Sequence, residues 1–373
     1  MTASTASRLD RLLGFLEQDA ANLSLIAEAA SAAIDENRPE LIPSLVQRYA
    51  KIAPPTAALR NLSGLAALRE SRIDEAREIF AQLLAEEHQD PALRFNLAWC
   101  LALGHDWTTV DTLLDSETLS TTPEAARLKL QALHHLARLD EALALGEQWI
   151  AAGRGSEALL GALTTIALDA EAFETAERYA AQIPGTLPGL TTQGMLALNA
   201  ERADRAGSLF EDALRQAPGD GRAQLGMGLS LLSQGEHAPA ARWLDQAAET
   251  FGDHLGSWVA AGWAHFVVGD LDSSRTRFEA ALALDETFSE AHGGLAVIDL
   301  LQGAADSAEQ RARRAMRLDR AGFGGALATS MLADQRGDAQ TAQRIRETAL
   351  NAPAGPGGRT ILQSMSSIGA RRR

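Results

Sequence analysis

The sequence predicts an all-α protein, a right-handed solenoid of antiparallel helix pairs. Alanine and leucine, both strong helix formers, dominate the composition. The clusters of Val, Ile, Thr and Tyr that are typical of sheet proteins are missing. Apolar residues make up 46% of the 373 positions, which is enough for a large core. The third observation is an internal repeat, which should be sought before any other feature.

A small residue recurs at a fixed interval along most of the chain. Over the C-terminal half the interval is 34 residues, at Ala206, Ala240, Ser274, Ala308 and Ala342. The same position falls earlier, at slightly variable intervals, at Ala76, Val110, Ala142 and Ala176. A more degenerate repeat over residues 23–49 places Ile42 there. We therefore expect about ten helix pairs in a single solenoid domain over residues 23–350.

The interval and the residues at fixed offsets resemble the tetratricopeptide repeat, whose pattern is W-x2-L-G-x2-Y…A-x3-F…P. The best repeat carries Trp258, Gly262, His265, Phe278 and Ala281. Another carries Gly194, Ala206, Phe210, Ala213 and Pro218, and an earlier one has Gly64, Ala76 and Phe80. In this pattern, glycines such as Gly194, Gly228 and Gly262 let the two helices of a pair approach closely. Phe210 and Phe278 are expected to fill the space between neighbouring pairs.

Turn residues divide the pairs into first and second helices. Glycines fall between them and are expected to supply the left-handed residue after a helix, at Gly104, Gly235, Gly269, Gly303 and Gly337. Acidic residues follow near the start of the second helix, at Asp270, Asp306 and Asp338. The glycines of Gly322–Gly325 and Pro353–Gly358 are interpreted as turn and linker residues.

Both ends of the chain differ from the repeat. In residues 1–22, Leu9, Leu12, Leu13 and Leu16 form one helical stripe, which predicts a capping helix over residues 8–18. The alternative is a helix that docks on a partner. Residues 351–373 are rich in Gly, Pro and Ser and end in three arginines, which predicts a flexible tail.

Motifs for catalysis, metal binding and nucleotide binding are missing. The sequence contains no phosphate loop, no HExxH and no GxSxG, so we expect no enzyme, no cofactor and no metal site. The eight histidines are scattered, and adjacent His134 and His135 point to different helix faces. The single cysteine, Cys100, cannot form an internal disulfide and is expected to be a buried apolar residue.

The net charge and the distribution of apolar residues limit the kinds of partner that we expect for this chain. A net charge of −15 disfavours nucleic-acid binding, because phosphate backbones are repelled by an acidic surface. No secretory signal and no membrane-length apolar run is visible, so we expect a cytoplasmic protein without membrane insertion. Arginine replaces lysine almost throughout, which indicates a bacterial genome composition.

The resemblance implies that first helices line a concave inner face. The residues expected to point inward and bind a partner are Phe95, Trp99, Leu225, Leu229, Val259, Trp263, Phe266 and Val297. Large aromatic residues on an open face suggest binding anchors, although tight curvature would bury them against neighbouring helices instead. Between the two apolar stretches, Arg127, Gln131 and His134 would make the face polar. Only Asn61 and Arg127 could serve in the carboxylate clamp of some family members, so that clamp is not expected.

The predicted function is that of a scaffold or adaptor that binds a peptide or amphipathic helix of another protein. The alternative is a regulatory or assembly subunit of secretion, pilus or envelope machinery that positions a catalytic partner. The alternative rests on analogy with other repeat proteins and not on a site in this chain.

Overall fold

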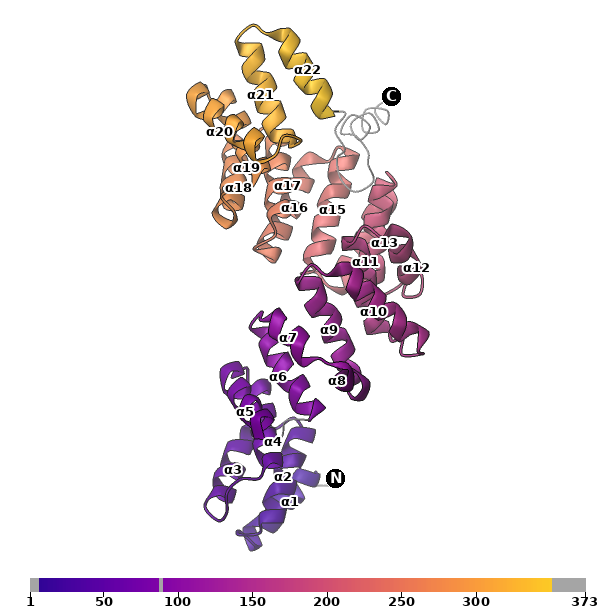
Figure 1. The fold of residues 1–373 in the computed structure, drawn as a ribbon, viewed down its shortest axis with the longest axis vertical. Coiled ribbons are helices and arrows are strands. Elements are labelled where there is room, and N and C mark those ends of the chain that lie inside the picture. The colour runs from indigo at the N-terminus through magenta and orange to yellow at the C-terminus, as the bar shows by residue number, and fades with distance from the viewer. Residues whose placement is uncertain (1–6, 87–89, 351–373) are drawn as a thin grey trace, which may run out of the picture. The chain divides into compact units, whose positions relative to one another are not determined.

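A computed structural model describes residues 7–86 and 90–350 of the chain. In these residues the regular structure is helical and no strand is present, which confirms the predicted all-α class (Figure 1). Contacts within the chain cluster in two compact units, residues 1–166 and 167–373, and the boundary falls inside α11 (Glu157–Asp169). The two are referred to below as the N-terminal unit and the C-terminal unit.

In the N-terminal unit the first helices of the pairs are the even-numbered α2, α4 and α6, and then α9 after one extra helix. The elements before α11 are α1 (Arg8–Gln18), α2 (Leu23–Asp35), the 3-10 turn η1 (Pro39–Leu41), α3 (Ile42–Ala50), α4 (Ala57–Arg69), α5 (Ile73–Glu86), α6 (Pro91–Leu103), α7 (Trp107–Leu113), α8 (Ser116–Thr121), α9 (Pro123–His135) and α10 (Leu139–Ala151).

In the C-terminal unit the pairs follow one another regularly, with odd-numbered first helices. The elements after α11 are α12 (Phe173–Ala180), α13 (Leu187–Asn199), α14 (Ala203–Gln216), α15 (Gly221–Gln234), α16 (His237–Phe251), α17 (Leu255–Val268), α18 (Leu271–Leu284), α19 (Ser289–Leu301), α20 (Ala305–Leu318), α21 (Phe323–Gln335) and α22 (Ala339–Leu350).

Phenylalanines and glycines interlock in the core as the repeat pattern predicts. Phe210 is fully buried. A Cβ atom placed on Gly194, in the preceding first helix, would lie 2.6 Å from its ring, and one placed on Gly226, in the next first helix, would lie 2.2 Å away. Phe278 is held in the same way between Gly262 and Gly294. Each phenylalanine ring therefore fills the junction between two helix pairs. The residues that face the ring from the two first helices must be glycine, because a larger side chain would clash with it.

The chain begins with the helix that the leucine stripe predicts. Ser7 caps α1 by accepting a hydrogen bond from the backbone N–H of Asp10 at 3.0 Å. Leu9, Leu12 and Leu16 are buried in a cluster that also contains residues of α2, α3 and α4. At the other end, the predicted flexible tail, residues 351–373, lies outside the described residues.

Left-handed residues mark the turn inside each pair. The four later glycines predicted for this role adopt φ values of 84°, 88°, 81° and 79°, at Gly235, Gly269, Gly303 and Gly337. Gly104 does not, since its φ is −92°. That prediction is wrong by one position, because the left-handed residue of this turn is His105, with φ of 62°. Other earlier turns also place a residue with a Cβ there, at Asn37, Ser71, Ala137, Glu171 and Glu201.

Replacing Ala137 with glycine is expected to stabilise the protein. The left-handed conformation costs a residue with a Cβ roughly 1–2 kcal/mol, and glycine avoids this cost while losing some chain entropy. Ala137 is exposed and its methyl group is the only part removed, so we expect a gain of about 0.5–1 kcal/mol. The control is Ala81→Gly at an exposed position inside α5, which should lose about 1 kcal/mol. Urea unfolding of both variants measures the difference, and equal destabilisation would contradict the strain argument.

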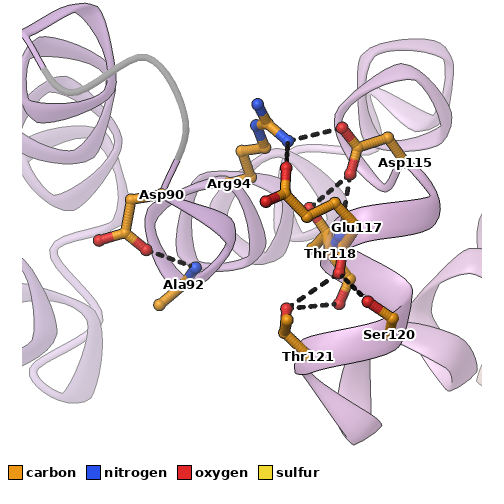
Figure 2. A network of polar contacts seen from close by, with 8 residues as sticks. All are labelled: Asp90, Ala92, Arg94, Asp115, Glu117, Thr118, Ser120 and Thr121. Carbon is orange, nitrogen blue, oxygen red and sulfur yellow. Dashed lines mark hydrogen bonds and ion pairs between the residues drawn. The ribbon is translucent and has the colours of Figure 1, made fainter.

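An extra helix, α8, follows the second helix α7. It lies in the stretch where the repeat interval, from Val110 to Ala142, is shorter than 34 residues. The second helix α7 ends at Leu113, and Asp115 then caps the short helix α8 by accepting hydrogen bonds from Thr118 N–H and Thr118 Oγ1 at 2.9 and 2.8 Å. Figure 2 shows Arg94 of α6 reaching both Asp115, at 2.5 Å, and Glu117, at 3.4 Å. The backbone N–H of Thr118, together with Arg94, lowers the pKa of the Asp115 carboxyl. One arginine thus fastens the inserted helix to the preceding first helix.

Candidate functional site

The eight residues predicted to face a partner fall in both units and differ in burial. Phe95 and Trp99 lie on α6 of the N-terminal unit, and the other six lie on α15, α17 and α19 of the C-terminal unit. Six of the eight are half-buried, namely Phe95, Trp99, Leu225, Leu229, Trp263 and Phe266. Val259 is only 9% exposed, and Val297 is 0% exposed. Val297 is therefore a core residue and cannot contact a partner as predicted.

Close helix packing explains why Val297 is buried. A Cβ atom placed on Gly293 of α19 would lie 2.3 Å from the carbonyl carbon of Gly324 and 2.3 Å from the backbone nitrogen of Gly325, both in α21. The backbones of α19 and α21 thus meet with no side chain between them. The interpretation of Gly324 and Gly325 as turn glycines is wrong, because both lie within α21 and permit the approach. Residues Ala291–Leu300 are buried on every face of α19 as a result.

Trp263 and Phe266 are covered by neighbouring aromatic rings. The ring of Trp263 makes edge contacts with Phe266, Phe278 and Phe323, with centroid distances of 5.5, 5.2 and 5.4 Å. Phe323 is the first residue of α21, so α21 contributes a side chain to the face where a partner is expected. Both residues also pack against the buried cluster that contains Val297 and Leu300. The predicted anchor at Trp263 is largely part of the fold.

A half-buried carboxylate anchors this aromatic cluster. Oε1 of Glu290 accepts hydrogen bonds from Trp263 Nε1 at 3.0 Å and from the backbone N–H of Gly324 at 3.1 Å. Burial raises the pKa of the Glu290 carboxyl, and the nearby Asp319 carboxylate raises it further, while the two donors oppose both effects. Glu290 thereby holds the N-terminus of α21 against α17, where an acceptor also suits the helix dipole.

A Glu290→Gln variant tests the direction of this pKa. Because the folded-state pKa is raised, the stability linked to Glu290 is present at low pH and is lost as the pH rises through the folded pKa. The amide oxygen of the replacing glutamine can still accept from both donors. We therefore expect the free energy of unfolding of wild type, relative to the variant, to fall as the pH rises above about 4, the ordinary pKa of a glutamate. Urea unfolding across this range measures it, and Glu211→Gln at an exposed position corrects for losing one carboxylate. A relative rise with pH would show that the two hydrogen bonds outweigh burial.

A row of half-buried apolar residues lies on α13 and α15, and it includes Leu225 and Leu229 of the predicted face. Leu225, Leu229 and Leu232 of α15 are half-buried and pack against a buried cluster of α16 and α17 residues, namely Ala241, Leu244, Ala261 and Ala264. On α13, Met195 and Leu198 are also half-buried, over the cluster that contains Phe210. Leucine at three successive turns of one helix, with part of each side chain exposed, gives a continuous apolar strip. The five residues Met195, Leu198, Leu225, Leu229 and Leu232 are called the leucine strip below.

In the N-terminal unit the predicted face has a mixed character. The rings of Phe95 and Trp99 lie 6.1 Å apart at 47°, and Arg127 of α9 stands over Trp99 with its Cζ 5.7 Å from the ring centroid. Arg127 and Gln131 are exposed and His134 is half-buried, in agreement with the predicted polar stretch. Arg127 thus forms a cation–π contact with Trp99, and this face of the Trp99 ring is already covered within the chain.

Two acidic residues that organise ion pairs escaped the sequence analysis. Asp299 of α19 has a side chain only 5% exposed, and its carboxylate lies 2.5 Å from Arg275 Nη2 and 3.0 Å from Arg311 Nε. It also accepts a hydrogen bond from Ser307 at 2.6 Å, so it joins α18, α19 and α20. Asp245 bridges His265, at 2.9 Å, and Arg277, at 2.8 Å. The signal for Asp299 was a single acidic residue inside the apolar run of α19.

The described residues contain no group of three or more His, Cys, Asp or Glu side chains arranged to hold a metal ion. Cys100 is buried, and burial raises the pKa of its thiol to about 11, so the thiol stays protonated at neutral pH. This agrees with its predicted role as a small apolar residue. Across the described helices, none is both long enough and apolar enough to cross a membrane.

Comparison with protein families identifies the repeat. The tetratricopeptide repeat model matches residues 61–109, 191–254 and 259–322. These regions contain the glycine, alanine and phenylalanine positions that interlock in the core. A search of curated protein sequences finds no match.

The solved structures that this chain is similar to are distant from it in sequence. A monomeric mutant of IFIT1 with Gppp-AAAA is 12% identical with a TM-score of 0.54, and the match covers 91% of this chain and 93% of that one. The human IFIT1 dimer with PPP-AAAA is 12% identical with a TM-score of 0.53, over 92% and 93% of the two chains. A crystal structure of MamA protein is 16% identical with a TM-score of 0.36, over 43% of this chain and 91% of that one. At 12% identity the likeness to IFIT1 is one of fold.

Proposed function

We propose that this tetratricopeptide repeat protein is a binding scaffold, and that the leucine strip of α13 and α15 receives an amphipathic helix of a partner protein. Repeats of this type generally mediate protein–protein interactions, which favours a binding role. The observation that carries the proposal is the strip itself, because Leu225, Leu229 and Leu232 expose apolar surface at successive turns of one first helix. An apolar helix face laid against such a strip is an established recognition mode.

The location of the strip differs from the surface expected from sequence alone. Trp263 and Phe266 lie on α17, where Trp263 contacts Phe278, Phe323 and Glu290, and Phe266 contacts the Trp263 ring. Because their contacts are made with other rings and with Glu290, we assign both residues to the fold and not to the binding surface. The exposed edges of the strip's leucines and methionine are left for the partner, and these two residue types adapt readily to different helix faces.

The test selects a helix and then asks which residues hold it. A displayed library of helical peptides, which contains both amphipathic and uniformly polar sequences, is selected against the full chain, and the best peptide is titrated against Leu229→Gln. We expect this change to weaken binding by at least about tenfold, because a polar group enters the centre of the strip. The matched control is Leu284→Gln, since Leu284 is 48% exposed on the second helix α18. It should bind as wild type does.

Thermal melts of both variants accompany the titration. A folded Leu229→Gln protein with unchanged affinity would exclude the strip as the binding surface. Equal losses in Leu229→Gln and Leu284→Gln would show that the selected peptide adheres to exposed leucines in general. Selection of peptides without an apolar face would exclude the amphipathic helix as the ligand.

A further inference from the structure

The fourth residue of the first helix makes the same kind of hydrogen bond, to a carbonyl of the preceding turn, in three successive helix pairs. The fourth residue of α15 is Gln224, and its Nε2 donates to the carbonyl of Pro218 at 2.9 Å. The fourth residue of α17 is Trp258, whose Nε1 donates to the carbonyl of Gly252 at 2.8 Å. The fourth residue of α19 is His292, whose Nε2 donates to the carbonyl of Glu286 at 2.9 Å. In each pair a side chain with an N–H group fills the space beside the preceding turn and satisfies its carbonyl.

The last described pair lacks this side chain. The fourth residue of α21 is Ala326, 34 residues after His292, and its methyl group can neither fill the space nor donate a hydrogen bond. A pocket of about 450 Å³ lies there instead. Its lining residues are Met316, Arg320, Ala321, Ala326, Arg344, Ile345 and Thr348.

The lining matches the surroundings of the histidine in the preceding pair. Arg320 follows Glu286 by 34 residues, and Glu286 provides the carbonyl that His292 contacts. Thr348 follows Arg314 by 34 residues, and Arg314 also donates to the Glu286 carbonyl. The pocket therefore lies at the place that His292 fills one pair earlier, and Met316, Ala326 and Ile345 contribute apolar side chains to its lining. By the same correspondence, the carbonyl of Arg320 is the counterpart of the Glu286 carbonyl that accepts from His292.

The rim of the pocket is basic. Arg320 and Arg344 stand where the preceding pair has Glu286 and Gln310. Within the described part of the chain neither arginine forms an ion pair, and the side chain of Arg344 donates only to Thr341 Oγ1, at 3.1 Å. Most arginines around them are paired, for example Arg313 and Arg336 with Glu309. In a chain with a net charge of −15, this basic rim favours an acidic ligand.

We propose that this pocket receives the indole of a tryptophan from an acidic segment of a partner protein. Trp258 shows that an indole fits between a turn and a second helix in this architecture and that its N–H reaches the turn carbonyl. Tryptophan combines a large apolar surface with one donor, which matches the apolar lining of the pocket and the turn carbonyl of Arg320. Carboxylates on either side of it would pair with Arg320 and Arg344. The chain's own residues 351–373 contain no Trp, His, Asp or Glu and carry four arginines, so they do not have this chemistry.

A labelled peptide with the sequence DEEWEED, capped at both ends, is the probe, and fluorescence anisotropy with the full chain is the measurement. We expect saturable binding, and at least about tenfold weaker binding when its tryptophan is replaced by leucine. An Ala326→Trp variant should lose binding by at least about tenfold, because its own indole fills the pocket as Trp258 fills the equivalent space two pairs earlier. Arg344→Glu should weaken binding, and added salt should do the same. Ala339→Trp, at an exposed position of α22, should bind as wild type does.

Several results would overturn the proposal. Undiminished binding by a folded Ala326→Trp protein would place the peptide elsewhere, and equal affinity for the leucine peptide would exclude the indole. If Ala326→Trp does not fold, Ala326→Gln reproduces the arrangement at Gln224 and must weaken binding in its place. Binding that appears only after Ile361→Asp would show that the chain's own C-terminal residues occupy the pocket. Leu229→Gln should leave this binding unchanged, so the test is independent of the leucine strip.

Discussion

A Gly293→Ala variant is expected to lose about 3 kcal/mol or more of its free energy of unfolding. The added methyl carbon would lie 2.3 Å from two backbone atoms of α21, the carbonyl carbon of Gly324 and the nitrogen of Gly325. Side chains can rotate away from an added methyl group, but backbone atoms in a helix cannot. The helices α19 and α21 must therefore separate, and every contact around α19 is loosened with them.

The control for this experiment is a glycine with room around it. Gly207 lies inside α14, and a Cβ atom there would meet its nearest neighbour, Gln234 Nε2, at 3.5 Å, an ordinary contact distance. Gly207→Ala should therefore raise stability by about 0.5–1 kcal/mol, because alanine loses less conformational entropy in a helix. Chemical unfolding of both variants gives the comparison. If Gly293→Ala is as stable as Gly207→Ala, the two helices are farther apart than their glycines indicate.

Much of the fold follows from the repeat interval. The interval places the small residues Gly194 and Gly262 opposite Phe210 and Phe278, and the structure shows these contacts. It also predicts the turn inside each pair, where Gly235 takes the left-handed conformation. These features are local to one pair or to two neighbours, so a pattern that repeats along the sequence is sufficient to predict them.

The candidate site could be predicted only in part, because it depends on departures from the repeat. The pattern shows that Val297 points inward, but it does not show that Gly293 and Gly324 bring α21 close enough to bury it. From the sequence alone, each of these glycines looks like any other glycine in a helix, because the residue that it faces in the other helix is not known. The same holds for Glu290, whose role depends on Trp263 in an earlier pair and on Gly324 in a later one.

A Trp263→Ala variant is expected to be destabilised by about 3–4 kcal/mol. The change removes ring contacts with Phe266, Phe278 and Phe323 at once. It also removes one of the donors that offset the burial of the Glu290 carboxylate. Loss of the ring leaves a cavity where α17, α18 and α21 meet, so the whole C-terminal unit should unfold at a lower denaturant concentration.

Trp263→Phe separates the two contributions of this residue. Phenylalanine keeps most of the aromatic packing but cannot donate to Glu290, so it should cost about 1–2 kcal/mol, well below the loss in Trp263→Ala. Urea unfolding measures both, and the helix peptide selected on the leucine strip is titrated against each variant under conditions where it is folded. If Trp263 supports the strip without forming it, folded Trp263→Phe should bind that peptide within about twofold of wild type. A Trp263→Ala protein that is as stable as wild type but has lost the peptide would reverse this assignment, because the tryptophan would then be a binding anchor and the rings around it only neighbours.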